Sequence, residues 1–308
     1  MRKKLLTMLA VLLCSLLTTY GQALSGTGDG TEESPYKIFN ENQLSQMANY
    51  LNQEGVVFRL MNDLDITDWI AENNPRQGWL PIGVESTPFK GKFYGDNHTI
   101  RGVMINRTST NNVGFFGYVS GATITNLTIE GTTVAGAQNV GGLAGYITGS
   151  TITNCHVVLT EVAGANTFVG GIAGYSNNTN FQTFSVSASV TGTIGRVGGV
   201  VGKAENGGVF SDGSFSGEVL GNDNHTGGLI GYGIGLTLTN IIVKGTVSGQ
   251  DYTGGIVACN ENGILNNCRY EGTLTGSQYV GGIVGALVKT TSSFTSSFSK
   301  GKIIATGD

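Results

Sequence analysis

The stretch "NVGGLAG" at residues 139–145 places two adjacent glycines inside an apolar run, and the chain repeats this pattern. An imperfect earlier copy, "NVGFFGY", occupies residues 112–118. Successive glycine pairs lie 27 to 29 residues apart, and a fixed period of this length is typical of stacked structural units. The other copies are "FVGGIAG" at 168–174, "RVGGVVG" at 196–202, "HTGGLIG" at 225–231, "YTGGIVA" at 252–258 and "YVGGIVG" at 279–285.

Each unit continues with the same order of short runs. The glycine pair is followed by a polar turn, a β-branched run such as "TITNCHVV" at 151–158, and a further run such as "GTVSG" at 245–249. No helical period follows Asn112, and a propeller blade would need about 40 residues. We therefore predict an all-β fold: a right-handed parallel β-helix (a solenoid) of about seven coils of 27–29 residues, with three short strands in each coil.

The glycine pairs are predicted to form corners of the coil. Corners need backbone angles that only glycine adopts at low cost, and stacked corners leave little room for a Cβ atom. The apolar residue after each pair should stack inside the coil as its core. The corner glycines are Gly141, Gly142, Gly170, Gly171, Gly198, Gly199, Gly227, Gly228, Gly254, Gly255, Gly281 and Gly282. The core column comprises Leu143, Ile172, Val200, Leu229, Ile256 and Ile283.

Residues 24–111 differ from the repeats and are predicted to be an N-terminal α+β capping region that leads into the first coils. Asn40 and Gln43 form the pattern of a capping box, and Leu44, Met47 and Leu51 share a helical stripe. We expect this amphipathic helix to cover the open end of the solenoid core, because uncovered strand edges are a liability. The repeats occupy 112–308, and we expect them to continue past the C-terminus.

The first 23 residues have the pattern of a signal peptide. A basic start precedes the apolar stretch Leu5–Leu17, which is too short to span a bilayer, and small residues follow at Gly21 and Ala23. Cleavage after Ala23 would remove one Arg and two Lys, so the net charge would fall from −4 to −7. We therefore expect a secreted or bacterial cell-surface protein without a transmembrane segment in the mature chain. No basic run remains, which argues against a nucleic-acid partner.

The glycine-pair repeats resemble the GLUG-motif repeats of exported bacterial proteins. The resemblance rests on "VGGLAGY", "VGGIAGY" and "VGGVVG", and covers roughly Asn112 to the C-terminus. It implies a β-helical surface or secreted protein of the adhesin-like kind, without an established activity. GLUG repeats also accompany bacterial metallopeptidases, but this chain has no H-E-x-x-H motif and no C-x-x-C motif, so we expect no metal site of either kind.

The sequence contains no convergent cluster of catalytic or metal-binding residues. The acidic residues fall in turns of different coils, no pair of carboxylates shares one column, and we predict that the protein is not an enzyme. "NDLDITD" holds the densest acidic group, with Asp63, Asp65 and Asp68, where Ca²⁺ is a weak possibility and a solvated strand end is the preferred interpretation. No cofactor is expected. Cys259 and Cys268 fall within one coil, and we expect buried thiols rather than a bond.

Aromatic residues recur at one place after the glycine pair. They are predicted to stack as a column that lines a groove for sugars or an extended partner, or that covers a corner as a purely structural ladder. The favoured function is a noncatalytic, adhesin-like scaffold that binds an extracellular glycan or a host or matrix protein. A carbohydrate-active β-helix enzyme (polysaccharide lyase or glycosidase) and a spacer for a missing C-terminal domain are the alternatives. The tyrosines are Tyr118, Tyr146, Tyr175 and Tyr232; Lys203, Cys259 and Ala286 interrupt the column.

Overall fold

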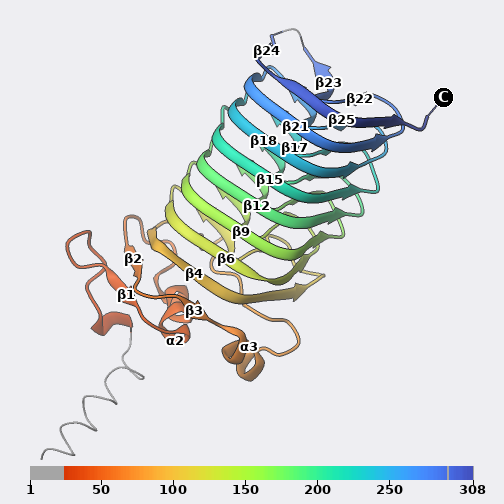
Figure 1. Ribbon diagram of the computed structural model, residues 1–308. Coiled ribbons are helices and arrows are strands. Elements are labelled where there is room, and N and C mark those ends of the chain that lie inside the picture. Colours follow the sequence, from red (N-terminus) through yellow and green to blue (C-terminus); the bar gives the residue numbers. More distant parts are fainter. Residues whose placement is uncertain (1–23, 290, 308) are drawn as a thin grey trace, which may run out of the picture.

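The computed structural model describes residues 24–289 and 291–307, so the predicted signal peptide at 1–23 lies outside the described residues. The chain winds into a parallel β-solenoid of about eight turns, and this confirms the predicted fold class (Figure 1). The extra turn arises because β4 (Lys92–Arg107) opens a coil before the first glycine-pair copy.

Three sheets run along the solenoid, and each coil contributes strands to all three. The 12-stranded sheet contains the long strands β4, β6 Thr123–Gly136, β9 Thr151–Gly164, β12 Asn180–Gly192, β15 Val209–Gly221, β18 Thr237–Ser248, β21 Ile264–Gly276, and the last two strands β24 Ser293–Thr295 and β25 Phe298–Ala305. The six-stranded sheet contains β7 Val140–Gly141, β10 Phe168–Gly170, β13 Arg196–Gly198, β16 Thr226–Gly227, β19 Thr253–Gly254 and β22 Val280–Gly281. The seven-stranded sheet contains β5 Phe116–Ser120, β8 Ala144–Thr148, β11 Ala173–Asn177, β14 Val201–Glu205, β17 Ile230–Ile234, β20 Val257–Glu261 and β23 Val284–Val288.

The stacking register follows the glycine-pair alignment. Val169 pairs with Val140 on one side and Val197 on the other, and the same register continues through Thr226 and Thr253. The core column stacks as predicted: the Leu143 amide donates to the Ile172 carbonyl at 3.1 Å, and Leu143, Ile172, Val200, Leu229 and Ile256 are all buried. Ile283 in the last coil is only partly buried.

The prediction of three short strands per coil is wrong in one respect. The two runs that follow the tyrosine strand merge into one long strand of 12 to 14 residues, as in β9 and β18. A residue with positive φ near the start of each long strand bends it without ending its pairing. At this position φ is 50° at Asn154 and 56° at Asn240.

Of the two predicted reasons for the corner glycines, the special backbone angles are wrong and the lack of room for a Cβ is confirmed. None of the twelve has a positive φ. Instead, a Cβ on Gly170 would lie 2.3 Å from the Ala173 carbonyl oxygen and 2.6 Å from the Val201 Cα, well inside van der Waals contact. The six-stranded sheet crosses so closely over its neighbours that only a hydrogen fits there.

The N-terminal part extends the long sheet and covers its first coil (Figure 1). Its helix α2 (Glu41–Ser45) starts at Asn40, whose side chain accepts from the Gln43 amide, and continues as η2 (Gln46–Tyr50). Leu44 and Met47 join the hydrophobic core. A second helix, α3 (Thr67–Asn73), was not predicted. The other elements are η1 Leu24–Gly26, β1 Tyr36–Ile38, β2 Val57–Leu60 and β3 Leu64–Asp65.

Candidate functional site: an aromatic and cationic stripe

The predicted tyrosine column exists and lies on the seven-stranded sheet. Tyr118 pairs with Tyr146, and Tyr146 pairs with Tyr175. Their rings stack with centroids 4.4 Å and 4.6 Å apart and planes 9° and 13° from parallel. Lys203 follows Tyr175 in the column, and Tyr232 follows Lys203.

This stacking decides what the tyrosines can offer a ligand. The ring faces of Tyr118, Tyr146 and Tyr175 cover one another at van der Waals distance, so no sugar ring fits between them. A ligand along this column would meet ring edges and hydroxyl groups. The rings stack as predicted, and any groove along the column would be lined by ring edges and hydroxyl groups.

A second column, which sequence analysis missed, adjoins the first on the six-stranded sheet. It is the residue directly before the Val-Gly-Gly or Thr-Gly-Gly triplet. His225 stacks on Tyr252 at 4.8 Å and 10°, and Tyr252 stacks on Tyr279 at 4.7 Å and 3°. In the sequence, this column is the first residue of each seven-residue copy of the glycine-pair pattern. In chain order it comprises Asn112, Asn139, Phe168, Arg196, His225, Tyr252 and Tyr279.

The backbone of the second column takes the left-handed conformation in most coils, and this conformation is strained at Tyr252 and Tyr279. His225, Tyr252 and Tyr279 have φ of 68°, 53° and 52°. Asn112 and Asn139 take the same conformation in earlier coils, with φ of 56° and 50°. Asparagine and histidine enter the left-handed region more readily than most residues, whereas a bulky tyrosine is a genuine outlier there. In the later coils, therefore, large rings occupy a backbone conformation that asparagine would adopt at a lower free-energy cost.

The two columns join in the middle of the solenoid. Phe168 lies 5.5 Å from Tyr175, and His225 meets Tyr232 edge-on at 5.3 Å. The Arg196 guanidinium carbon lies 5.6 Å from the Phe168 ring centroid and 5.3 Å from that of Tyr232. We call the continuous set the aromatic–cationic stripe; it comprises Tyr118, Tyr146, Phe168, Tyr175, Arg196, Lys203, His225, Tyr232, Tyr252 and Tyr279.

Charges within the stripe are largely paired. Lys203 lies 2.7 Å from Glu205, which also accepts a hydrogen bond from the Tyr175 hydroxyl. Burial raises the pKa of the Glu205 carboxyl, but the hydrogen bonds from Lys203 and Tyr175 outweigh burial and hold this pKa below its ordinary value. Burial, helped by Glu205, raises the pKa of Tyr175. Burial and the charge of Arg196 lower the pKa of His225, which favours the neutral imidazole.

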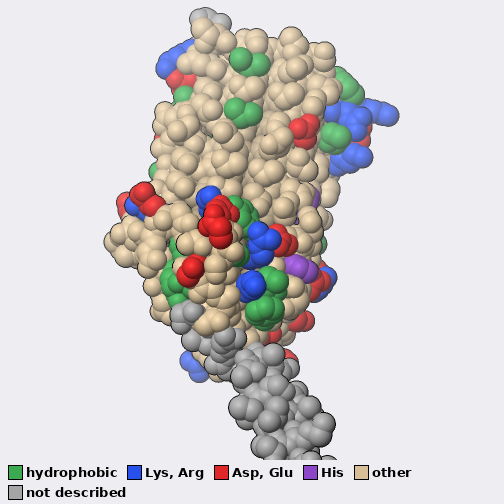
Figure 2. Space-filling view, turned by 90° about the vertical axis from the view of Figure 1, so that its left-hand side faces the viewer, with side chains coloured by type: hydrophobic (Ala, Val, Ile, Leu, Met, Phe, Trp, Pro, Cys, Tyr) green, Lys and Arg blue, Asp and Glu red, His purple; other side chains and the backbone are tan. Residues whose placement is uncertain are grey.

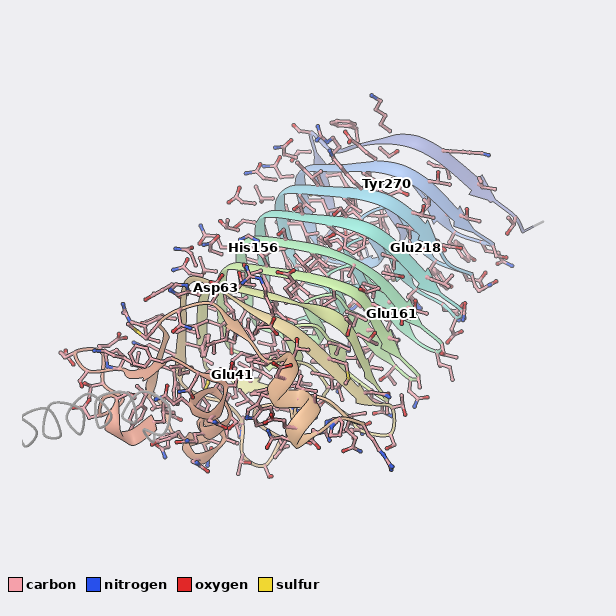
Figure 3. The ribbon with its side chains drawn as sticks, turned by 60° about the horizontal axis from the view of Figure 1, so that its bottom comes forward. Glu41, Asp63, His156, Glu161, Glu218 and Tyr270 are labelled. Atoms are coloured by element: carbon pink, nitrogen blue, oxygen red, sulfur yellow. The ribbon has the colours of Figure 1, made fainter. Side chains whose placement is uncertain are left out.

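Acidic side chains elsewhere are spread over the solenoid rather than gathered (Figure 3). The expectation that no two carboxylates share a column is nevertheless wrong. Glu161 and Glu218 stand in one outward column with Ser189 between them, and Glu205 and Glu261 stand in another with Ile234 between them. Two steps of about 4.8 Å separate the members of each pair by about 10 Å.

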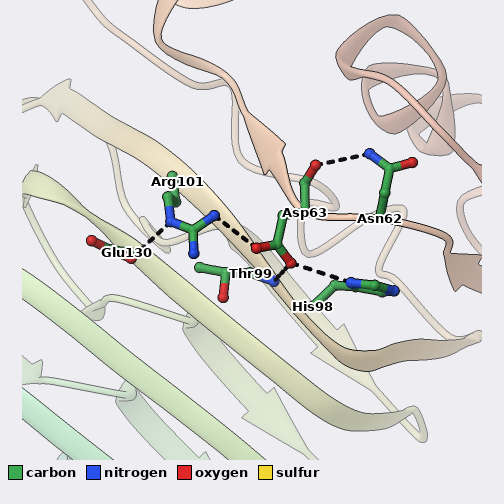
Figure 4. Close-up of polar contacts among 6 residues, drawn as sticks. All are labelled: Asn62, Asp63, His98, Thr99, Arg101 and Glu130. Atoms are coloured by element: carbon green, nitrogen blue, oxygen red, sulfur yellow. Dashed lines mark hydrogen bonds and ion pairs between the residues drawn. The ribbon is translucent and has the colours of Figure 1, made fainter.

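The acidic spot at Asp63 is engaged in a hydrogen-bond cluster (Figure 4). Its carboxylate accepts from Arg101 at 2.8 Å and from the Thr99 amide at 3.0 Å, and lies 3.2 Å from His98 Nδ1. The Arg101 hydrogen bond, followed by that of Thr99, lowers the Asp63 pKa to about 2. Asp65 instead accepts from the Thr67 amide at the start of α3, where Asp68 lies in the first turn. Among the described residues, no group of three or more His, Cys, Asp or Glu side chains is placed to hold a metal ion.

The model for "The GLUG motif" matches residues 136–160. This chain carries the GLUG motif. The match spans the corner strand β7, the tyrosine strand β8 and the first half of β9, so one GLUG match contains a glycine pair and one tyrosine of the stripe.

Two curated relatives align with part of this chain. The chain is 37% identical over 144 residues to a "Putative Gly-rich membrane protein" of Evansella cellulosilytica, and 34% identical over 128 residues to "Halomucin" of Haloquadratum walsbyi. The aligned segments cover 43% and 39% of this chain but only 16% and 1% of those proteins. This chain therefore spans only a small part of the length of these relatives.

A solved structure shows the same fold. The "putative immunoglobulin A1 protease" from Bacteroides ovatus superposes with a TM-score of 0.66 at 21% identity, covering 89% of this chain and 86% of that one. At this identity the likeness concerns the fold alone. In the described part of the GLUG protein, no helix is long and apolar enough to cross a membrane.

The GLUG repeats carry one more ladder that sequence analysis missed, at the bend of the long strands. Asn154 donates to Asn126, Asn240 to Asp212, and Asn267 to Asn240, each at 2.8 Å. The recurring "TN" and "NN" before an apolar residue was its signal.

Figure 2 shows one side of the solenoid, where charged side chains gather towards the N-terminal end and the rims, and much of the remaining surface is uncharged.

The described cysteines Cys155, Cys259 and Cys268 are free and buried, as expected. Burial raises the pKa of Cys155 to about 12 and that of Cys268 to about 11, so both thiols stay protonated. They act as small apolar side chains of the GLUG coils.

Proposed function

We propose that the protein is a noncatalytic, exported scaffold of the cell surface that acts as an adhesin and offers its aromatic–cationic stripe to an extracellular glycan or a host or matrix protein. The observation that carries this proposal is the strained backbone of Tyr252 and Tyr279. Strain of this kind costs on the order of 1–3 kcal/mol per residue and concentrates at functional sites.

A purely structural role explains the stripe less well. Stacked rings contribute about 0.5–1.5 kcal/mol per pair beyond their buried area, which roughly offsets the strain and leaves no net gain over asparagine. Asn139 shows the cheaper solution in the same column, since its side chain donates to Asn112 at 2.7 Å. Tyr279 is also 58% exposed, so much of its ring is available to a partner.

The test is a binding screen of the purified protein on a glycan array and a panel of matrix proteins. The double variant Tyr252→Asn, Tyr279→Asn removes two rings but keeps residues that suit a left-handed backbone. We expect it to lose at least about tenfold in affinity, while Phe39→Ser, which removes an aromatic side chain 45% exposed outside the stripe, binds like wild type. Equal binding by the double variant, or no binding by wild type, would contradict the proposal.

A carbohydrate-active enzyme is a second candidate function, because the carboxylates of Glu161 and Glu218 share one outward column. Their separation of about 10 Å is near the upper end of the carboxylate spacing in inverting glycosidases. Both side chains lie on the outer side of the long sheet, and Glu218 is exposed. Reducing-end release from polyuronides and neutral glycans tests this candidate, with Glu161→Gln as the inactive variant. Unchanged substrate with wild-type protein would remove it.

A further inference from the structure

Arg196 is the cation of the stripe whose side chain has no ion-pair or hydrogen-bond partner among the described residues. Its guanidinium lies between the Phe168 and Tyr232 rings, at 5.6 Å and 5.3 Å from their centroids. Neither an ion pair nor a hydrogen bond to this side chain occurs within residues 24–289 and 291–307, and its Nε is buried without a partner. Lys203, the other stripe cation, is instead neutralised by Glu205.

The two rings restrict what Arg196 can do. The guanidinium carbon lies over both rings, and burial removes Nε from contact with solvent. The remaining donors are the two Nη groups at the end of the side chain. Two parallel N–H donors fixed in one plane match the two oxygens of a carboxylate, and stacking between rings holds the group in place before the ligand arrives.

The surroundings restrict the ligand further. Glu205 and Glu261 stand along the same stripe, and Asp223 accepts a hydrogen bond from the Gly195 amide next to Arg196. A densely charged anion or an acidic peptide would meet these carboxylates and be repelled. A ligand with one carboxylate on an otherwise neutral, hydroxyl-rich body would avoid them and find hydrogen-bond partners in the Tyr175 and Tyr232 hydroxyls.

We propose that Arg196, held between Phe168 and Tyr232, binds the single carboxylate of an acidic sugar on an otherwise neutral glycan. This inference rests on the proposed adhesin function and names the ligand class of the same stripe. Because the chain as a whole is acidic, affinity depends on these local donors rather than on long-range attraction.

The experiment measures binding of sialyllactose, its neutral match lactose, and polygalacturonate by calorimetry and ligand-observed NMR. We expect wild type to prefer sialyllactose over lactose by at least about tenfold, the effect of one charge-assisted bidentate contact. Polygalacturonate should bind more weakly than sialyllactose per carboxylate. Arg196→Gln should bind sialyllactose no better than lactose, and Arg196→Lys should recover only part of the preference because lysine lacks the planar pair of donors. Arg76→Gln, which removes an exposed arginine outside the stripe, should bind like wild type.

Several results would overturn the inference. Equal binding of sialyllactose and lactose by wild type would do so whether or not the variants fold, and folded Arg196→Gln with an intact preference would do so as well. Tighter binding of polygalacturonate would contradict the single-carboxylate ligand. Stripe-dependent binding of neutral glycans or matrix protein alone would reject this inference but keep the adhesin proposal, whereas no binding in either experiment would reject both.

Discussion

The second glycine of each pair lies four residues before the tyrosine column, and in the six coils that carry a pair the glycines are constant whereas the column residue varies. The glycine pair recurs unchanged in six coils, whereas the other column reads Tyr118, Tyr146, Tyr175, Lys203, Tyr232, Cys259 and Ala286. Both columns stack in strict parallel register. Register alone therefore does not impose one residue type.

The difference reflects the space available at each position. A side chain at the glycine pair would enter the backbone of neighbouring strands, as the 2.3 Å distance at Gly170 shows. Residues of the tyrosine column lie on the outer side of their sheet and tolerate rings, a lysine or a small residue. Constant columns in a solenoid thus mark steric necessity, and variable columns mark positions where another requirement, such as binding, can act.

The largest expected effect tests the steric side of this comparison. Gly170→Ala should lower the free energy of unfolding by at least about 4 kcal/mol, because backbone atoms around the new Cβ cannot move without breaking the sheet. Gly149→Ala is the matched control, since a Cβ there meets nothing within 4 Å and only the left-handed φ of 56° is penalised, by about 1–2 kcal/mol. Urea denaturation measures both, and similar losses would refute steric necessity.

The core column provides a second test, because its members share one register but differ in burial. Ile172→Ala should cost about 3 kcal/mol, through lost burial and the cavity left behind. Ile283→Ala, at the equivalent but partly exposed position in the last coil, should cost no more than about half as much. The shifts of the unfolding midpoints of the two variants test this prediction. Equal shifts would mean that a core side chain stabilises the last coil as much as an inner coil.

The constant columns are also what the sequence made predictable. Six glycine pairs at a fixed period are sufficient to place Leu143 over Ile172 and the tyrosines over one another. The long bent strands were missed because the residue at the bend, asparagine in most coils, was taken for the end of a strand, whereas the pairing continues past it. The lack of room at the glycine pairs was predictable because the repeat itself stacks the pairs on one another, whereas the expected special backbone angles were wrong.

The candidate site was only half predictable for the same reason. The tyrosine column repeats one residue type, so it could be read from the sequence. The adjoining column uses Phe168, Arg196, His225, Tyr252 and Tyr279, which share no obvious chemistry until the register brings their flat groups into contact. That Arg196 lies between two rings depends on contacts across coils and across two sheets.

A third test concerns the energy stored in the variable column. Tyr146 stacks on rings on both sides, so Tyr146→Leu should cost about 1–2 kcal/mol. Tyr146→Phe keeps both stacks and should cost less than about half of this. Thermal and urea unfolding measure the difference. If the leucine variant were as stable as the phenylalanine variant, ring stacking would contribute nothing to the stability of the column. The recurrence of tyrosine in successive coils would then need a purely functional reason.

The smallest effect depends on pH and comes from the first tyrosine of the column. Burial, followed by the neighbouring Tyr146, raises the pKa of Tyr118 to about 12, from an ordinary value of 10. The folded state therefore holds this proton more tightly than the unfolded state, so the contribution to stability is complete below pH 10 and is lost as the pH rises towards 12. Tyr118→Phe cannot ionise, and its stability relative to wild type should rise over that window by less than about 1 kcal/mol, because the ring is partly solvent-exposed. Urea unfolding of both proteins at pH 8, 10 and 11.5 tests this, since lysine titration is common to both and cancels in the difference. A difference that stays constant with pH would show that the Tyr118 hydroxyl ionises as freely in the folded protein as in the unfolded chain, and that the outer column is more open to water than its stacked rings imply.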